Sequence, residues 1–163
     1  MTPFLRGLDR LIGCIVATAK WLALPLIVLL FLQWPLRDLV RCCSREANDL
    51  GQIFFALFVA ASITAATRAG THLAADALAQ HYRPRIRHML RKAGALFGLV
   101  PWAAFVLVAS KPTVLSSVAA FEAFPDTANP GYFLIKLAVW VMALMVLAQT
   151  LVLVAQPMPQ DDV

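Results

Sequence analysis

Four long apolar segments constrain this chain more than any other feature of its sequence. Each is close to the length of about 17–25 residues with which an α-helix crosses a ~30 Å hydrocarbon core. None shows the alternation of apolar and polar residues that is typical of a membrane β-strand. The sequence therefore predicts an all-α integral membrane protein with four transmembrane helices, folded as a single domain over residues 1–163. The expected spans are residues 11–34, 50–67, 93–110 and 132–155.

The composition favours lipid as the surroundings of these segments. Of the 163 residues, 61% are hydrophobic and 14% are charged, whereas soluble domains average about 45–50% and about 25%. A chain this short could not bury so much apolar surface away from water. We therefore exclude a soluble enzyme, a disordered chain and a disulfide-rich secreted module. The net charge of +5 indicates basic loops held against anionic lipid, not a nucleic-acid partner.

Lys20 lies within the first expected span. A central Lys costs about 2.5–3.5 kcal/mol on insertion, while each Leu, Ile, Val or Phe returns about 0.3–0.6 kcal/mol. Thirteen such residues lie between positions 11 and 34, so the favourable sum is roughly 4–8 kcal/mol and the span is retained. We expect Lys20 to reach towards the cytoplasmic headgroups or to face a partner helix. A cleavable signal peptide is the alternative, but the apolar run resumes at Trp21, as in a membrane anchor.

The distribution of Lys and Arg predicts the orientation of the spans. Eight of these residues lie in the N-terminal segment and the second connection, against four in the first and third connections. By the positive-inside rule, both termini are expected in the cytoplasm. The second connection also shows helical spacing of apolar residues on both sides of Pro84. We therefore expect it to contain a cytoplasmic, cationic amphipathic helix, either a basic anchor or a docking surface for a partner.

Few side chains could support catalysis or metal binding. Cys14 lies in a span and is interpreted as a packing residue. Cys42 and Cys43 are adjacent on the expected periplasmic side, but the chain has no C-x-x-C pair of the kind used by quinone-linked thiol oxidoreductases. His72, His81 and His88 all belong to the second connection, whereas haem would need facing ligands within the bundle. A zinc site is not supported either, because no cluster completes a four-ligand set.

The spans themselves contain no carboxylate at mid-membrane depth, so an ion path of the chain's own is not predicted. The most distinctive polar group is instead located where the second span ends. Arg68 is suited to phosphate headgroups, Gly70 can turn the chain and Thr71 can cap the next helix. His72 and Asp76 are four residues apart and could pair on that helix. We interpret Arg68, Gly70, His72 and Asp76 as a structural corner or subunit interface, and we assign no catalytic, cofactor, metal or substrate-binding residue.

This corner carries a resemblance to a known family. The residues from Arg68 to Leu78 read R-x-G-x-H-[IL]-x-x-D-x-L, and in this position the motif resembles that of the small membrane subunit of TRAP (tripartite ATP-independent periplasmic) transporters, of the DctQ type. Length, number of spans and expected orientation agree, so the resemblance covers nearly the whole chain. Ala74-Ala75 departs from the larger apolar residue that many members carry before Asp76. Three further stretches are also similar to that family: residues 32–38 (LQWPLRD), 46–52 (EANDLGQ) and 129–132 (NPGY).

The resemblance implies a function that the residues alone do not supply. Such a small subunit binds a large permease subunit, which carries the substrate and sodium sites and moves in an elevator fashion. A periplasmic solute-binding protein delivers the substrate, usually an organic acid. The small subunit braces the fixed part of the permease, so we expect membrane lipid and these two proteins as partners, and neither enzyme activity nor a cofactor. A quinone-linked membrane thiol oxidoreductase and an unrelated four-helix membrane assembly factor or small transporter remain as alternatives.

Overall fold

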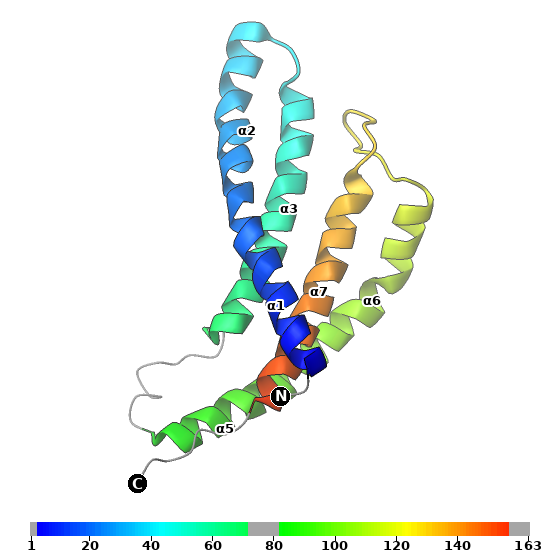
Figure 1. Cartoon of the computed structure of the whole chain (residues 1–163). Coiled ribbons are helices and arrows are strands. Elements are labelled where there is room, and N and C mark those ends of the chain that lie inside the picture. Colours follow the sequence, from blue (N-terminus) through cyan, green and yellow to red (C-terminus); the bar gives the residue numbers. More distant parts are fainter. Residues whose placement is uncertain (1–2, 72–81, 157–163) are drawn as a thin grey trace.

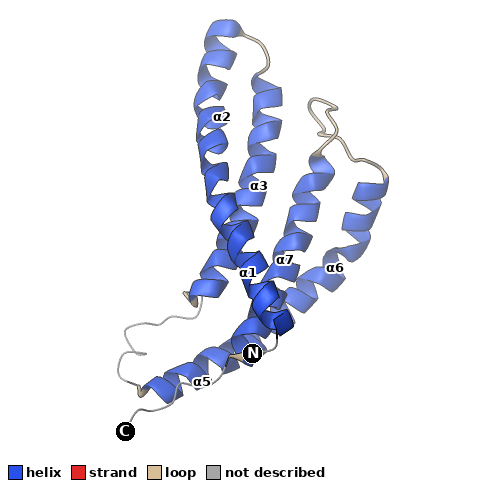
Figure 2. Ribbon diagram, in the orientation of Figure 1, coloured by secondary structure: helices blue, strands red, loops and turns tan. Residues whose placement is uncertain are grey.

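The computed structural model describes residues 3–71 and 82–156, and these residues contain helices but no β-strand (Figure 2). Four helical segments are long and apolar enough to cross a membrane: Pro3–Val40, Ser44–Ala69, Arg85–Ala119 and Tyr132–Ala155. Each span predicted from the sequence lies inside one of these segments, so the prediction of four helices able to span a membrane is confirmed. The first three segments extend beyond the predicted spans, because polar residues end an apolar run without ending a helix.

The elements follow one another along the chain in a simple order (Figure 1). The first segment consists of α1 (Pro3–Ala19), a 3-10 turn (Lys20–Leu22), α2 (Ala23–Pro35) and a wide π turn (Leu36–Val40). The second is α3 (Ser44–Ala69). The third consists of α5 (Pro84–Gly94), a π turn (Ala95–Leu99) and α6 (Val100–Ala119), and the fourth is α7 (Tyr132–Ala155).

The second connection is helical in its described part. Pro84 stands in the first turn of α5, where its missing N–H removes no helical hydrogen bond. The apolar side chains of Ile86, Met89 and Leu90 on α5 are exposed, as expected for a helix with one face available to lipid. Residues 72–81, which form the other half of the predicted amphipathic connection, lie outside the described residues.

Two prolines coincide with changes in the helical turn. Pro25 has no N–H to donate to the carbonyl oxygen of Trp21, four residues earlier. The helix tightens at this point into the 3-10 turn over Lys20–Leu22. Pro101 likewise leaves the carbonyl oxygen of Phe97 without its usual donor, and the helix widens there into the π turn over Ala95–Leu99. The long first and third segments are therefore bent where proline interrupts the regular hydrogen bonds.

The helices form an open row, not a closed bundle (Figure 1). In the middle of the row α3 packs on α7, while α2 lies beside α3 and α6 lies beside α7. At the end of the molecule that holds α5, α1 crosses both α3 and α7. Towards the other end the α2–α3 pair and the α6–α7 pair diverge, and the α2–α3 hairpin extends further than the α6–α7 hairpin (Figure 1).

Burial follows this arrangement. In the most apolar stretch of each segment, 44% of the residues of α7 and 28% of those of α3 are buried, against 6% for the first segment and 11% for the third. The central contact uses small side chains, including Ala60 of α3 and Ala103 of α6, around Met142 and Val146 of α7. Small residues let helix backbones approach closely where lipid offers no hydrophobic drive for packing. The flanking helices consequently leave most of their apolar surface outside the core.

Candidate functional site

Arg68, the first residue of the predicted corner, holds α3 against α1. Its guanidinium donates to the backbone oxygen of Asp9 at 2.8 Å and to the Asp9 carboxylate at 2.9 Å. Both side chains are about one-third exposed, at 34% for Arg68 and 32% for Asp9. The sequence singled out Arg68 but not Asp9, which lies 59 positions away. One signal was present: Asp9 lies in the N-terminal segment, which the charge bias places on the same side of the membrane as Arg68.

Gly70 ends α3 in the left-handed conformation, with φ of 70°. The N–H of Gly70 donates to the carbonyl oxygen of Thr67, and the N–H of Thr71 donates to that of Ala66, both at 3.1 Å. This pair of hydrogen bonds is the Schellman motif, which favours glycine at the left-handed position. The Thr71 hydroxyl also donates to the Ala66 carbonyl oxygen, at 3.2 Å. The structure thus places Arg68 and Gly70 at one helix end, while His72 and Asp76 lie outside the described residues.

Basic residues of α5 contact the same end of the molecule. The guanidinium of Arg91 lies so close to Gly70 that a Cβ at that position would be 2.1 Å from its Nη2 atom. Lys92 donates to the backbone oxygen of Gln156, which follows α7, at 2.5 Å. Arg68 thus connects α3 to α1, while Arg91 and Lys92 bring α5 into contact with the ends of α3 and α7. The sequence predicted a basic surface on α5 but not these contacts.

A groove of about 410 Å³ lies between α1 and α3, next to the Arg68–Asp9 pair. Lys20 and Arg68 both line it, so the cation inside the first apolar segment and the cation at the end of α3 border the same space. Phe58 provides an apolar part of the wall. Small residues open the groove by leaving room between the helices: Gly13, Ala17, Ala61 and Ala65.

The opposite end of the molecule brings together the three other stretches that carry the family resemblance. Gln33 of α2 donates to the side-chain oxygen of Asn48 of α3 at 3.3 Å. Asp49 is buried, and its carboxylate accepts a hydrogen bond from Thr127 in the loop between α6 and α7. Gly131, with φ of 148°, lies close to Ile53 of α3, since a Cβ there would be 3.3 Å from its Cδ1 atom. Residues 32–38, 46–52 and 129–132 are therefore neighbours in space.

A second groove, of about 350 Å³, opens at this end between α2, α3 and the α6–α7 loop. Its polar lining has both charges, with two guanidinium groups and two carboxylates. The two helices provide most of these residues, and the loop provides one. The polar lining residues are Gln33, Arg37, Ser44, Arg45, Asn48, Asp49 and Asp126.

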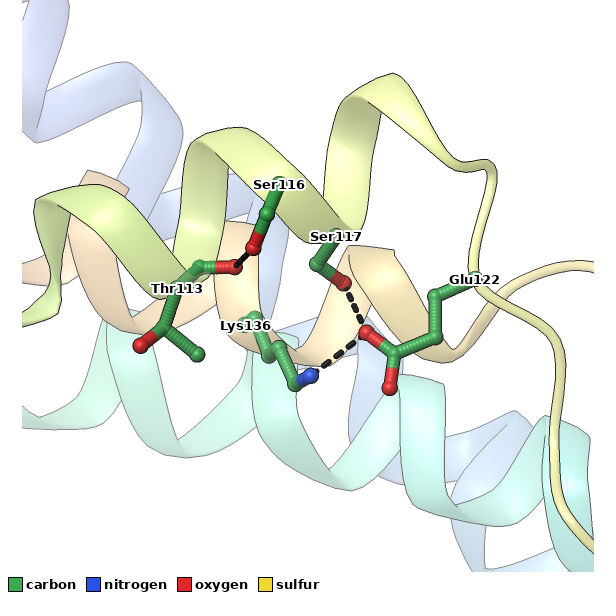
Figure 3. Close-up of polar contacts among 5 residues, drawn as sticks. All are labelled: Thr113, Ser116, Ser117, Glu122 and Lys136. Atoms are coloured by element: carbon green, nitrogen blue, oxygen red, sulfur yellow. Dashed lines mark hydrogen bonds and ion pairs between the residues drawn. The ribbon is translucent and has the colours of Figure 1, made fainter.

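The α6–α7 loop is anchored by Glu122 (Figure 3). Its carboxylate accepts hydrogen bonds from Lys136 of α7 and from Ser117 of α6. Lys136 also lies over the ring of Tyr132, with its Nζ atom 5.1 Å from the ring centre. The hydrogen bond from Lys136, and after it that from Ser117, lower the pKa of the Glu122 carboxyl. This network was not predicted from the sequence, because no local spacing relates Glu122 to Lys136, which lies 14 positions away on α7.

No group of three His, Cys, Asp or Glu residues that could hold a metal ion occurs within residues 3–71 and 82–156. Cys14, Cys42 and Cys43 are free and exposed. Comparisons with protein-family models, with curated proteins and with solved structures find no match to the chain. The two polar ends and the open helix row are thus the features on which a functional proposal can rest.

Proposed function

We propose that this chain is the small membrane subunit of a TRAP-type secondary transporter, which braces a large permease subunit during sodium-coupled uptake of an organic acid. The observation that carries the proposal is the open row of helices. In the most apolar stretch of the first segment only 6% of the residues are buried, and in that of the third segment only 11%. The remaining 94% and 89% are therefore not buried within the chain. A protein with such flanks is suited to packing against a larger membrane protein along its length.

The placement of the charged residues supports a scaffold. The acidic residues of the described spans and loops lie near the helix ends, such as Asp9, Asp49 and Glu122, and each of these three has a partner within the chain. A sodium path of the chain's own would use carboxylates at the middle of the membrane. We therefore assign substrate and sodium binding to the large permease subunit.

The groove at the end that holds the α6–α7 loop is a suitable contact for the periplasmic solute-binding protein. Its mixed lining of guanidinium and carboxylate groups offers complementary charges to a polar protein surface, which favours orientation and fast association over tight binding. This assignment follows from the predicted orientation, in which both termini are cytoplasmic and the groove faces the periplasm. The proposed location is the bacterial inner membrane.

Co-expression with candidate permease genes tests the proposal. The full chain should co-purify with one large membrane subunit in mild detergent, and the pair with its solute-binding protein should catalyse sodium-driven uptake of an organic acid in liposomes. The permease alone is the matched control and should assemble poorly or transport slowly. Sodium-driven uptake by the small chain alone, or full uptake by the permease without it, would contradict the bracing role.

A quinone-linked thiol oxidoreductase is the second candidate, because the Sγ atoms of Cys42 and Cys43 lie 2.9 Å apart on the surface. Such an enzyme would lose quinone-dependent thiol oxidation when both residues are replaced by Ser. The transporter subunit would keep its assembly and its uptake rate in the same variant. The comparison of these two activities in one preparation distinguishes the candidates.

A further inference from the structure

The turn between α2 and α3 brings two adjacent thiols together. Cys42 and Cys43 are both exposed, and their Sγ atoms are 2.9 Å apart. Neighbouring side chains in an extended chain point to opposite faces and do not meet in this way. Here Arg41 and Cys43 adopt positive φ values of 54° and 57°, a left-handed conformation that is uncommon for residues other than glycine. The backbone of the turn thus places both sulfur atoms on the same side.

We propose that Cys42 and Cys43 form a reversible disulfide with each other when a small disulfide such as oxidised glutathione acts as the oxidant. An S–S bond is about 2.05 Å long, so the two sulfur atoms need to approach by only roughly 1 Å. Both atoms are accessible to a small reagent because both residues are exposed. The proposal concerns a modification site and does not depend on the proposed transport function.

The reaction is a two-step thiol–disulfide exchange. The thiolate of one cysteine attacks a sulfur atom of oxidised glutathione, forms a mixed disulfide and releases one glutathione thiolate, which takes up the proton that the cysteine lost. The second cysteine loses its proton and attacks the protein sulfur of the mixed disulfide, which releases the second glutathione. Two thiols of the protein are oxidised by two electrons, and one molecule of oxidised glutathione is reduced to two of the thiol.

The order of attack follows from the contact between the two thiols. The hydrogen bond with Cys42, followed by the charge of Cys42, raises the pKa of the Cys43 thiol. Because the raised pKa delays the loss of its proton, we assign the second attack to Cys43. The attack of Cys43 then completes the ring, because its sulfur is already adjacent to the mixed disulfide.

The bond should be labile and not a permanent structural link. The Cα atoms of adjacent residues are about 3.8 Å apart, whereas the Cα atoms of most disulfide pairs are about 4.4–6.8 Å apart. Short-range and exposed disulfides are the ones that thiols reduce most readily. The ring would form immediately before Ser44 and Arg45, which line the groove between α2 and α3.

Mass spectrometry of the full-length protein in detergent tests the proposal, in a Cys14→Ser background that leaves only this pair. After treatment with oxidised glutathione, the protein should lose two hydrogen atoms in mass, release two glutathione molecules per chain and stop reacting with maleimide. Mild reduction with dithiothreitol should restore both thiols. Size-exclusion chromatography should show an unchanged elution volume, because the disulfide forms within one chain.

The single variants Cys42→Ser and Cys43→Ser are the matched controls. Each should gain one glutathione and release one, because the second step is no longer possible. The Cys14→Ser protein, which keeps both Cys42 and Cys43, provides the decisive result. The proposal is overturned if this protein accumulates a stable mixed disulfide, if it cross-links between chains, or if both of its thiols still react with maleimide. Tryptic peptides that contain residues 42 and 43 locate the modification in each case.

Discussion

At the scale of single residues, Arg68 shows how the chain accommodates a cation near the end of a membrane helix. A partly buried charge is expensive unless it has a partner of opposite charge. Arg68 finds this partner in Asp9, with both the carboxylate and the backbone oxygen as acceptors. The side chain thereby links α1 to α3 instead of only reaching for a headgroup. This link can be measured.

We expect the Arg68–Asp9 pair to show a coupling of about 0.5–1 kcal/mol in a double-mutant cycle with Arg68→Ala and Asp9→Asn. The estimate is modest because both side chains are about one-third exposed. The measurement is reversible unfolding in mixed micelles. The exposed pair of Arg37 and Asp38, at 70% and 42% exposure, is the matched control and should show no measurable coupling. Equal coupling in the two cycles would contradict a structural role of Arg68.

Sequence reasoning found one side of this site and missed the other. Arg68 and Gly70 are recognisable because a cation and a glycine at the end of an apolar run mark a helix terminus. Asp9 was not found because no local spacing relates residues 59 positions apart. The same reason explains the buried contact of Asp49 with Thr127, since its partner lies in another loop. Long-range polar pairs depend on how helices pack, and a single sequence does not contain that information.

At the scale of elements, the end of α3 depends on one backbone conformation. A left-handed residue with a side chain costs about 1–2 kcal/mol, and a Cβ at Gly70 would also displace the guanidinium of Arg91. We therefore expect Gly70→Ala to lower the free energy of unfolding by about 1–2 kcal/mol. Gly7→Ala is the control, because a Cβ at Gly7 meets no atom within 4 Å and Ala favours a helix over Gly. A neutral Gly70→Ala would show that the turn is not fixed by this residue.

The α6–α7 loop should loosen in acid. Hydrogen bonds from Lys136 and Ser117 lower the pKa of Glu122 in the folded protein, so the unfolded state binds the proton more readily. The stabilisation is complete above the ordinary carboxyl pKa and is lost as the pH falls through the lowered value. Hydrogen exchange of residues 120–131 should consequently rise on acidification in the native chain. In the Glu122→Gln variant, the hydrogen exchange of these residues should already be raised at neutral pH and should change less on acidification. An acid response equal to that of the native chain would contradict the assignment of this effect to Glu122.

The helices themselves were predictable to different degrees. The four apolar runs marked the spans because burial in lipid demands continuous apolar length. Pro25 and Pro101 lie close to the places where the helical turn changes. The turn type at each bend was not predictable, since a proline removes a hydrogen bond without deciding whether the helix tightens or widens. The helix ends also extended beyond the runs, as in the first segment, which continues to Val40.

At the scale of the whole molecule, the order of the helices in the row could not be read from the sequence. All four spans are apolar on most faces, so the pattern of apolar residues does not indicate which face of a span contacts protein and which contacts lipid. The structure places α3 and α7 in the centre, where they use small residues such as Ala60 and Ala61 of α3 and Ala143 of α7. The family resemblance predicted a partner subunit but not which helices would be left open to it.

The orientation of the molecule is testable with the two surface thiols. We expect four crossings, by the four segments that are long and apolar enough to span a membrane, to place both termini on one side and the α2–α3 turn on the other. The charge bias predicts that Cys42 and Cys43 face the periplasm. In a Cys14→Ser background, an impermeant maleimide should label them in intact spheroplasts after mild reduction. Labelling that appears only after the membrane is opened would reverse the predicted orientation.

The bracing role predicts a particular change in transport kinetics. The double variant Arg68→Ala with Asp76→Ala should lower the amount of assembled complex and the maximal uptake rate. The solute concentration for half-maximal uptake should not change, because we assign the substrate site to the large subunit. Uptake is measured against solute concentration and normalised to assembled complex, with Lys111→Ala as the control at an exposed residue that lines neither groove. A several-fold change in half-saturation at normal assembly would mean that the corner participates in solute recognition.

The length of the first apolar run has a consequence for the surrounding bilayer. The run covers residues 11–34, which at about 1.5 Å per residue is about 36 Å long, more than the ~30 Å thickness of a hydrocarbon core. The α2–α3 hairpin also extends beyond the α6–α7 hairpin (Figure 1). An apolar run that is longer than the bilayer core is accommodated by tilting, so we expect the first segment to tilt in the membrane. Short-chain lipids should accordingly incline the molecule further than long-chain lipids do.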